Sequence, residues 1–172
     1  VRLVLVEAFD PARQAARSDY IAMLKGDIET ELSFKVSGVI ERIGPGPDLD
    51  WQEGTAVRRG DILARLKPED FVSSVKSARA RADQDRQNHE REVKLRASGA
   101  VSQQELEAAA AAREASAAAL AQAEQALQDS VLRAPFDGII ANRSVNQGET
   151  ISPGKAVLRL ADLRQMSVEL GL

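Results

Sequence analysis

Residues 97–105 read Ala-Ser-Gly-Ala-Val-Ser-Gln-Gln-Glu, and this short stretch interrupts an otherwise unbroken helical pattern. The pattern covers about residues 68–130, has no internal proline, and is dominated by the strong helix formers Ala, Glu, Gln, Arg and Leu. Gly99 can end one helix in a left-handed conformation, and Ser102 with Glu105 forms a capping box that begins another. Because so short a connection makes the helices antiparallel neighbours, the sequence predicts a helical hairpin with arms of about 28 residues, or roughly 40 Å.

The second arm carries a heptad pattern of apolar and small residues, which predicts its contact with the first arm. We expect its contacting positions to be Leu106, Ala110, Arg113, Ala117, Leu120, Glu124, Leu127 and Val131. The first arm begins with a similar apolar face, loses it, and regains it near the turn. Its positions in order are Phe71, Val75, Ala78, Ala82, Asp85, His89, Val93 and Leu95. The half of the hairpin near the turn is therefore expected to pack weakly alone and to be completed by partner helices.

The segments on either side of the helical stretch repeat each other. Gly54, Gly60 and Leu66 are spaced six and six residues apart, and Gly148, Gly154 and Leu160 have the same spacing. Upstream, residues 37–40, Ser-Gly-Val-Ile, match residues 137–140, Asp-Gly-Ile-Ile. Two half-sheets with glycine at their turns cannot each bury an apolar face alone, but they can pack on each other as a small sandwich. The hairpin is then an insertion between the two halves.

Composition excludes several classes of function. The 23 basic and 26 acidic residues are mixed along the chain, so the net charge of -3 leaves no basic field for nucleic acid. Without cysteine the chain has no thiol nucleophile and no cysteine-rich zinc site, and His89, the only histidine, is expected on the seam or the surface. Asp48 and Asp50 have no base or nucleophile near them, and Trp51 is expected to pack over the sandwich edge. We therefore predict no catalytic residue, no cofactor and no metal site.

Taken in order, these motifs resemble the periplasmic adaptor proteins, or HlyD-like membrane fusion proteins, of resistance-nodulation-division efflux pumps. The residues that carry the resemblance are 37–40, 53–66, the Ala-rich hairpin, 134–140 (Ala-Pro-Phe-Asp-Gly-Ile-Ile) and 148–163. The resemblance implies an α+β fold, a barrel-sandwich hybrid or lipoyl-like domain of two half-motifs with an inserted antiparallel hairpin. It also implies partial β-barrel strands at both termini and further sequence beyond both ends.

The resemblance divides the chain into five segments. They are an N-terminal segment with a partial β-barrel strand (1–35), the first lipoyl-like half (36–67), the hairpin (68–131), the second half (132–163) and the start of a β-barrel domain (164–172).

In this family the hairpin tip docks onto an outer-membrane channel of the TolC type through an Arg, an apolar residue four positions on and a Ser seven further. Arg91, Leu95 and Ser102 fit that spacing, and Val101 adds apolar surface beside them. Arg91 and Leu95 would project together from one helix face, and Ser102 could cap the second arm while offering its hydroxyl. Glu92 departs from the family pattern, which has a leucine or an aromatic residue at this position, so the identity of the channel stays open.

The resemblance implies a non-enzymatic coupling role in proton-driven export of drugs or other small compounds, as in multidrug resistance. The implied partners are an inner-membrane transporter, an outer-membrane channel and further copies of the adaptor in a trimeric or hexameric ring. The implied location is the periplasm, with anchoring to the inner membrane.

Three alternatives stay open from the sequence. An adaptor of an ATP-driven exporter or of a type I secretion system uses the same modules. A periplasmic small-molecule-binding protein belongs to another class, and the chain lacks the aromatic or charged clusters expected of its pocket. A cytosolic coiled-coil scaffold would explain the helices but not the duplicated β halves.

Overall fold

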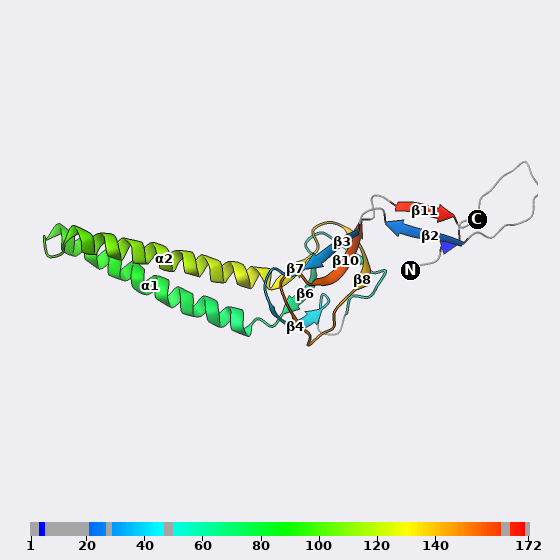
Figure 1. The fold of residues 1–172 in the computed structure, drawn as a ribbon, viewed down its shortest axis with the longest axis horizontal. Coiled ribbons are helices and arrows are strands. Elements are labelled where there is room, and N and C mark those ends of the chain that lie inside the picture. Colours follow the sequence, from blue (N-terminus) through cyan, green and yellow to red (C-terminus); the bar gives the residue numbers. More distant parts are fainter. Residues whose placement is uncertain (1–3, 6–20, 27–28, 47–49, 163–165, 171–172) are drawn as a thin grey trace, which may run out of the picture. The chain divides into compact units, whose positions relative to one another are not determined.

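The computed structural model describes residues 4–5, 21–26, 29–46, 50–162 and 166–170 (Figure 1). In chain order the elements are β1 (Val4–Leu5), β2 (Ile21–Gly26), β3 (Glu29–Ser33), β4 (Gly38–Ile43), β5 (Ala56–Val57), β6 (Ile62–Leu66), α1 (Glu69–Ala97), α2 (Gln103–Asp129), β7 (Val131–Arg133), β8 (Gly138–Arg143), β9 (Thr150–Ile151), β10 (Ala156–Asp162) and β11 (Met166–Leu170). They form two compact units, one of Leu66–Val131 and the other of Val1–Arg65 with Leu132–Leu172.

The β unit contains two four-stranded sheets, and each sheet takes strands from both repeated halves. One has the order β3-β10-β8-β5 and the other the order β7-β6-β4-β9. The pairs β5 with β8 and β4 with β9 are antiparallel and join residues from opposite sides of the hairpin insertion. The expectation of two separate half-sheets packed face to face was therefore wrong in detail, because the halves interlock strand by strand.

The turns of the two halves make the same hydrogen bonds to each other, as an internal repeat would require. Gly54 N donates to Ile140 O at 2.8 Å, and Gly148 N donates to Ile40 O at 2.8 Å. In return, Ile140 N donates to Thr55 O at 3.0 Å and Ile40 N to Glu149 O at 2.9 Å. Gly54 and Gly148 have φ of 84° and 82°, which favours glycine at these turns. Each half thus completes the hydrogen bonding of the other.

The core of the β unit is made of aliphatic side chains and one phenylalanine. Its fully buried members include Phe34, Ile40, Ile43, Leu63, Ile140, Val145, Ile151, Val157, Leu158 and Leu160. Both halves contribute to this list, so neither half has a core of its own. At roughly 1.5–3 kcal/mol for each large side chain buried, this shared core is the main stabilising contribution to the unit.

A third, three-stranded sheet joins the two ends of the chain in the order β1-β2-β11. Strands β2 and β11 pair antiparallel from Met166 opposite Gly26 to Leu170 opposite Ala22. Residues 1–3, 6–20, 27–28, 163–165 and 171–172 of the predicted terminal segments lie outside the described residues, as does Asp48. The predicted fold class, a barrel-sandwich hybrid with an inserted helical hairpin, is confirmed.

The helical unit is the predicted antiparallel hairpin, with α1 and α2 side by side (Figure 1). Helix α1 has 29 residues and α2 has 27. Gly99 has φ of 75° in the turn, and Ser102 and Glu105 form the predicted capping box. At the other end of the unit, Leu66 N donates to Ser130 O at 2.9 Å, so the two ends of the insertion meet.

The contact face of α2 follows the prediction except in the middle of the helix, since Leu106, Ala110, Leu120, Glu124 and Leu127 are all half-buried. Arg113 and Ala117 are exposed, whereas Ser116 is buried and Ala109 and Ala123 are half-buried. Leu106, Leu120 and Leu127 remain in the seam as predicted and are half-buried. Between them, Ser116 takes the place predicted for Ala117 and lies against α1. Small residues at these positions allow the arms to approach closely.

On α1 the predicted apolar face is present as far as Ala82 and then becomes polar. Asp85 is only 5% exposed, and His89 is half-buried, as the seam prediction required. Val93 and Leu95, which were predicted to resume the apolar face, remain 46% and 38% exposed. A buried carboxylate needs a partner, and Arg81 Nε supplies one to Asp85 Oδ2 at 2.9 Å.

Gly138 tests how tightly β8 packs against β10 within the second half. A Cβ at this position would lie 2.3 Å from the backbone oxygen of Ala161 on β10, so Gly138→Ala must displace a strand. We expect a loss of about 3 kcal/mol in the free energy of unfolding, measured by urea denaturation. Gly46→Ala is the matched control, because a Cβ there meets nothing within 4 Å. Equal unfolding midpoints for the two variants would contradict the close packing of β8 against β10.

Candidate functional site: the hairpin tip and its groove

The turn of the hairpin is held by hydrogen bonds from both arms. Gly99 N donates to Arg96 O at 3.0 Å, and Ala100 N donates to Leu95 O at 3.0 Å. The guanidinium of Arg96 then reaches across the turn, where Nη1 donates to Val101 O at 3.0 Å. The tip is therefore a defined structure, and Arg96 contributes to it although sequence reasoning did not select this residue.

Ser102 uses its hydroxyl within the tip. Its Oγ donates to Glu105 Oε2 at 2.8 Å and accepts from Glu105 N at 3.2 Å, while its own N–H donates to the same carboxylate at 2.7 Å. The hydrogen bonds from the Ser102 backbone and side chain lower the pKa of Glu105 below its ordinary value. A partner that docks here can therefore donate a hydrogen bond to Ser102, but it can accept one only if the capping box opens.

The other three predicted tip residues differ in how much of their side chain is available. Arg91 is exposed, and its Nη2 donates to Asn88 Oδ1 at 3.1 Å, so other guanidinium donors remain for a partner. Leu95 is also exposed, although its backbone oxygen is used by the turn. Val101 is half-buried and faces a groove between the arms. Arg91 is linked to that groove through Asn88, which is one of its lining residues.

The groove next to the tip, which we call the distal groove, has a volume of about 470 Å³. Its lining residues are Asp85, Asn88, Glu92, Val101, Glu105, Ala108, Ala109 and Ala112. Three are carboxylates, and Glu92 Oε2 is buried without a hydrogen-bond partner among the described residues. Sequence reasoning missed this groove. Acidic residues on α1 that face small residues on α2 could have indicated the groove. This pattern is visible only when it is known which residues of the two arms lie opposite each other.

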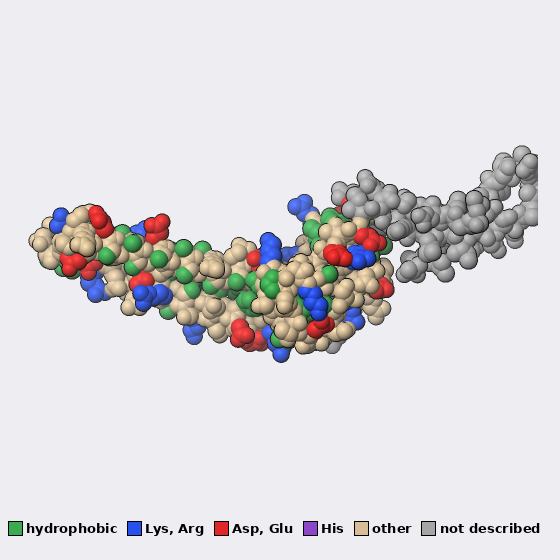
Figure 2. Space-filling model, viewed as in Figure 1, with side chains coloured by type: hydrophobic (Ala, Val, Ile, Leu, Met, Phe, Trp, Pro, Cys, Tyr) green, Lys and Arg blue, Asp and Glu red, His purple; other side chains and the backbone are tan. Residues whose placement is uncertain are grey.

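A second groove of about 470 Å³, the proximal groove, lies nearer the ends of the insertion. Its lining residues are Ser74, Ser77, Ala78, Arg81, Ser116, Ala119, Gln122, Ala123 and Ala126. In the view of Figure 2, hydrophobic side chains follow the hairpin and charged side chains are scattered between them. Neither groove has an aromatic side chain in its lining, which argues against a preformed pocket for a small molecule.

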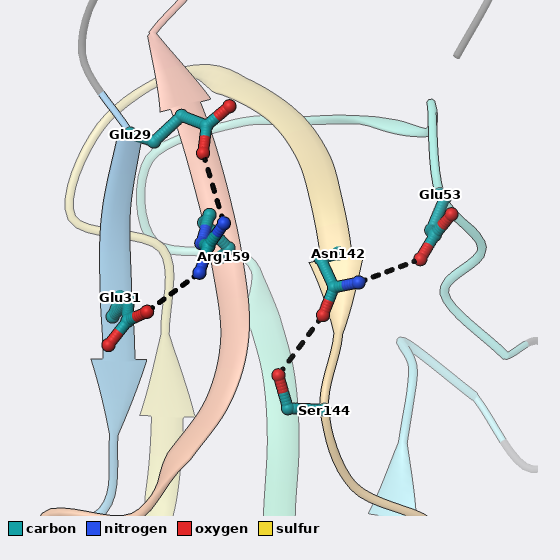
Figure 3. A network of polar contacts seen from close by, with 6 residues as sticks. All are labelled: Glu29, Glu31, Glu53, Asn142, Ser144 and Arg159. Atoms are coloured by element: carbon teal, nitrogen blue, oxygen red, sulfur yellow. Dashed lines mark hydrogen bonds and ion pairs between the residues drawn. The ribbon is translucent and has the colours of Figure 1, made fainter.

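The β unit carries its charges in paired networks on the surface (Figure 3). Arg159 on β10 lies between two carboxylates of β3, Glu31 at 2.8 Å and Glu29 at 3.4 Å, and Glu31 is the main cause of the raised pKa of the guanidinium. Asn142, on β8, donates through Nδ2 to Glu53 Oε1 at 3.2 Å, and its Oδ1 accepts from Ser144 Oγ at 3.1 Å. The groups of these two networks satisfy one another, so none of the six residues drawn in Figure 3 suggests chemistry.

Other residues that could suggest chemistry have structural surroundings. Asp50 pairs with Arg143 at 3.5 Å, and Trp51 Nε1 donates to Ile62 O at 2.9 Å. In the described part of the chain, no cluster of three His, Cys, Asp or Glu side chains could hold a metal ion. Within the same ranges, no helix is both long and apolar enough to cross a membrane.

Comparison with protein families places most of this chain in one domain. The family model of the CzcB-like barrel-sandwich hybrid domain matches residues 29–162. A search of curated proteins finds no match.

Solved structures with the same fold support that assignment. A protein of Bacteroides eggerthii, named as a candidate efflux transporter, is 26% identical with a TM-score of 0.73 over 95% of this chain and 52% of its own. A chimera of MacA with the α-hairpin of Pseudomonas aeruginosa MexA is 27% identical with a TM-score of 0.69, over 87% of this chain and 51% of its own. ZneB of Cupriavidus metallidurans, at 19% identity and a TM-score of 0.53 over 87% of this chain and 67% of its own, shares the fold. The chain spans about half the length of the first two.

The capping box makes the tip sensitive to acid. The pKa of Glu105 in the folded hairpin lies below its ordinary value of 4.5. The ionised carboxylate therefore stabilises the tip at pH values above 4.5, and this stabilisation is lost as the pH falls through the folded pKa. We expect the Ser102 amide signal to shift in an NMR titration below pH 4.5. Glu105→Gln should remove the step, and an unchanged titration in that variant would contradict the assignment.

Proposed function

Because the chain belongs to the CzcB-like barrel-sandwich hybrid family, within the membrane fusion or adaptor proteins of efflux systems, we propose that it couples an inner-membrane transporter to an outer-membrane channel of the TolC type. Membrane fusion proteins are non-enzymatic, and adaptors of this family are periplasmic. In the proposed role the exported compound is moved without being converted, and a separate transporter supplies the energy. The full-length protein would be anchored at the inner membrane.

One observation carries the proposal: the insertion ends in an ordered tip with unused binding groups. Leu95 is 38% exposed, and Arg91 makes only the hydrogen bond to Asn88 among the described residues. The turn is fixed by Arg96 and by the capping box, so these side chains are presented in one arrangement before any partner arrives. Preorganisation of this kind lowers the entropy lost on docking. The MacA and MexA chimera, which carries an α-hairpin domain by name, adds support for a hairpin used as a separate module.

We propose Arg91, Leu95, Val101 and Ser102 as the docking residues for the channel. Arg91 would bind backbone or side-chain oxygens at the end of a channel helix pair, and Leu95 and Val101 would bury apolar surface. Ser102 would accept a hydrogen bond, because its own proton is donated to Glu105. Several copies of the adaptor would stand side by side in a trimeric or hexameric ring. Drugs or other small compounds would pass through this ring in proton-driven export.

An adaptor of an ATP-driven exporter remains the second candidate. The same hairpin and barrel-sandwich hybrid would serve both systems. The two candidates differ in the transporter that co-purifies with the full-length protein.

The docking residues are tested by cysteine crosslinking in actively exporting cells. The chain has no native cysteine, so single substitutions at Arg91, Leu95 and Ser102 give unambiguous products. We expect each to trap an outer-membrane channel protein, whereas Ala118→Cys, exposed on α2 away from the tip, should not. If the tip positions trap nothing while export continues, the proposed docking site is wrong.

Leu95→Asp tests the apolar contribution separately. The side chain is exposed, so the hairpin should fold normally, but a charge placed against a partner's apolar surface should lower export by about tenfold or more. Export is measured as resistance or as efflux of a fluorescent substrate, with Ala118→Asp as control. Export at the control level would exclude Leu95 from the contact.

A further inference from the structure

The internal repeat allows the two halves of the β unit to be compared residue by residue. Residues 31–43 correspond to residues 131–143, because leucine, glycine and isoleucine recur at the same places, and residues 54–66 correspond to residues 148–160 through their glycines. The sheets correspond as well, since β4 and β6 are neighbours in one sheet as β8 and β10 are in the other. A charged group that has a partner in one half can therefore be compared with its counterpart in the other.

In the second half, the charge of Arg159 is balanced within the β unit. Arg159 on β10 lies opposite Asn142 of β8, which is neutral. On its other side the guanidinium binds two carboxylates of β3, Glu31 at 2.8 Å and Glu29 at 3.4 Å (Figure 3). One cation thus has two anions and no cation beside it.

In the first half, the counterpart of this arginine is Arg65, and its charge is not balanced. The position opposite it in the repeat is Arg42 instead of an asparagine, and the position of Glu31 is taken by Val131. Like charges directly opposite each other on neighbouring strands are destabilising. Both arginines are half-buried, and the Nε of each is buried without a hydrogen-bond partner among the described residues. An uncompensated pair of this kind lacks an anion.

The acidic groups nearby do not supply that anion. Glu41 is the only carboxylate on β4 and β6, yet its Oε2 is also buried without a partner in the described part of the chain, and a single carboxylate would still leave one positive charge. The turn that leads into β6 adds two exposed arginines, Arg58 and Arg59. The carboxylate of that turn, Asp61, accepts a hydrogen bond from Arg58 N at 2.8 Å. We call the surface around Arg42 and Arg65 the basic face.

The guanidiniums of the basic face are available to a partner. Only the Nε atom of each is enclosed, so the Nη atoms of Arg42 and Arg65 remain open and make no hydrogen bond with the described residues. Neighbouring strands lie about 4.8 Å apart, so the two planar groups can bind adjacent carboxylates, each through two hydrogen bonds. The second half shows which chemistry fits, because Glu29 and Glu31 on the extended strand β3 bind Arg159 with one residue between them.

The β unit of a second copy has no carboxylate left to offer, because its described carboxylates other than Glu41 are already bound. Asp162 is engaged as well. Side chains bind Glu29, Glu31, Asp50, Glu53 and Glu149, and backbone N–H groups bind Asp61 and Asp137. The anion for the basic face therefore comes from a different source.

We propose that the basic face binds an acidic, extended segment of another protein, whose carboxylates pair with Arg42 and Arg65 as those of β3 pair with Arg159. Binding would remove the repulsion between the two arginines and satisfy their free donors, so the strain in the free protein favours the complex. The inference goes beyond the proposed function, which assigns contact only to the hairpin tip.

Carbodiimide crosslinking of the full-length protein in membranes of exporting cells tests the proposal. Arg65→Lys and Arg42→Lys keep the positive charge and introduce an amine. A water-soluble carbodiimide activates a carboxylate, and the amine then forms an amide with it while the reagent leaves as a urea. We expect mass spectrometry to find each introduced amine joined to an Asp or Glu of another protein. Native lysines react in every variant, so only products at these two positions count.

Arg159→Lys is the matched control, because its introduced amine should join Glu29 or Glu31 of the same chain. If the control forms this product while positions 42 and 65 form none, the proposal is overturned, and the same holds for a free phosphate or a lipid headgroup as the occupant. Products that join these positions only to Glu41 or to a second copy of the chain would also overturn it.

Arg42→Asn separates binding from a structural role, because it copies the residue of the second half. We expect the thermal unfolding midpoint of the full-length protein to stay the same or rise, since a like charge is removed. The crosslinking yield of Arg65→Lys in this background should fall about fivefold or more. A lower midpoint would indicate a structural role, and an unchanged yield would exclude Arg42 from the contact; either result contradicts the proposal.

The two binding surfaces can fail independently. If the tip cysteines trap no channel protein while the introduced amines still join an acidic protein segment, the docking proposal is wrong and the basic face stands. If the tip traps the channel and the amines join nothing, the reverse holds.

Discussion

The structure depends on the exchange of backbone hydrogen bonds between the two repeated halves of the β unit. Ile40 binds the turn of the second half, and Ile140 binds the turn of the first, through matching N–H and carbonyl groups. This exchange assembles two sheets that each contain strands from both sides of the insertion. It also brings the chain back to the place where it left for the hairpin, so the hairpin needs no structural adjustment of its host. The sequence of the hairpin tip can therefore vary without a change in the core.

Most of the architecture was predictable because its signals are local. A few neighbouring residues are enough to predict a helix end or a turn. Examples are the turn at Gly99, the capping box at Ser102 and the repeated glycine spacing. The strand exchange was not predictable from the repeat, because similarity between halves does not say whether they pair with themselves or with each other. The α2 seam was wrong only at Arg113 and Ala117, for a related reason. Ala109 and Ala110 both satisfy a heptad, and only contact with α1 places Ser116 inside and Ala117 outside.

The candidate site shows the same division. Arg91, Leu95, Val101 and Ser102 could be selected from their spacing, but their hydrogen bonds could not, and these decide that Ser102 has no free proton to donate. The grooves were missed because they form where a row of alanines on α2 leaves space that larger side chains would fill. Glu92 appeared first as a departure from a motif, and only the structure shows that its Oε2 is buried without a hydrogen-bond partner among the described residues.

The interlocked halves have a consequence for how the protein is made. Glu29 and Arg159, which join β3 to β10, are 130 positions apart in the chain. A ribosome that adds about 5–20 residues per second needs several seconds or more to deliver the second strand after the first. During that interval the first half presents unpaired strand edges, while the helices, whose hydrogen bonds are local, can form as they emerge. The nascent chain is therefore most vulnerable to aggregation before its last third is synthesised, which is a reason for it to depend on chaperones.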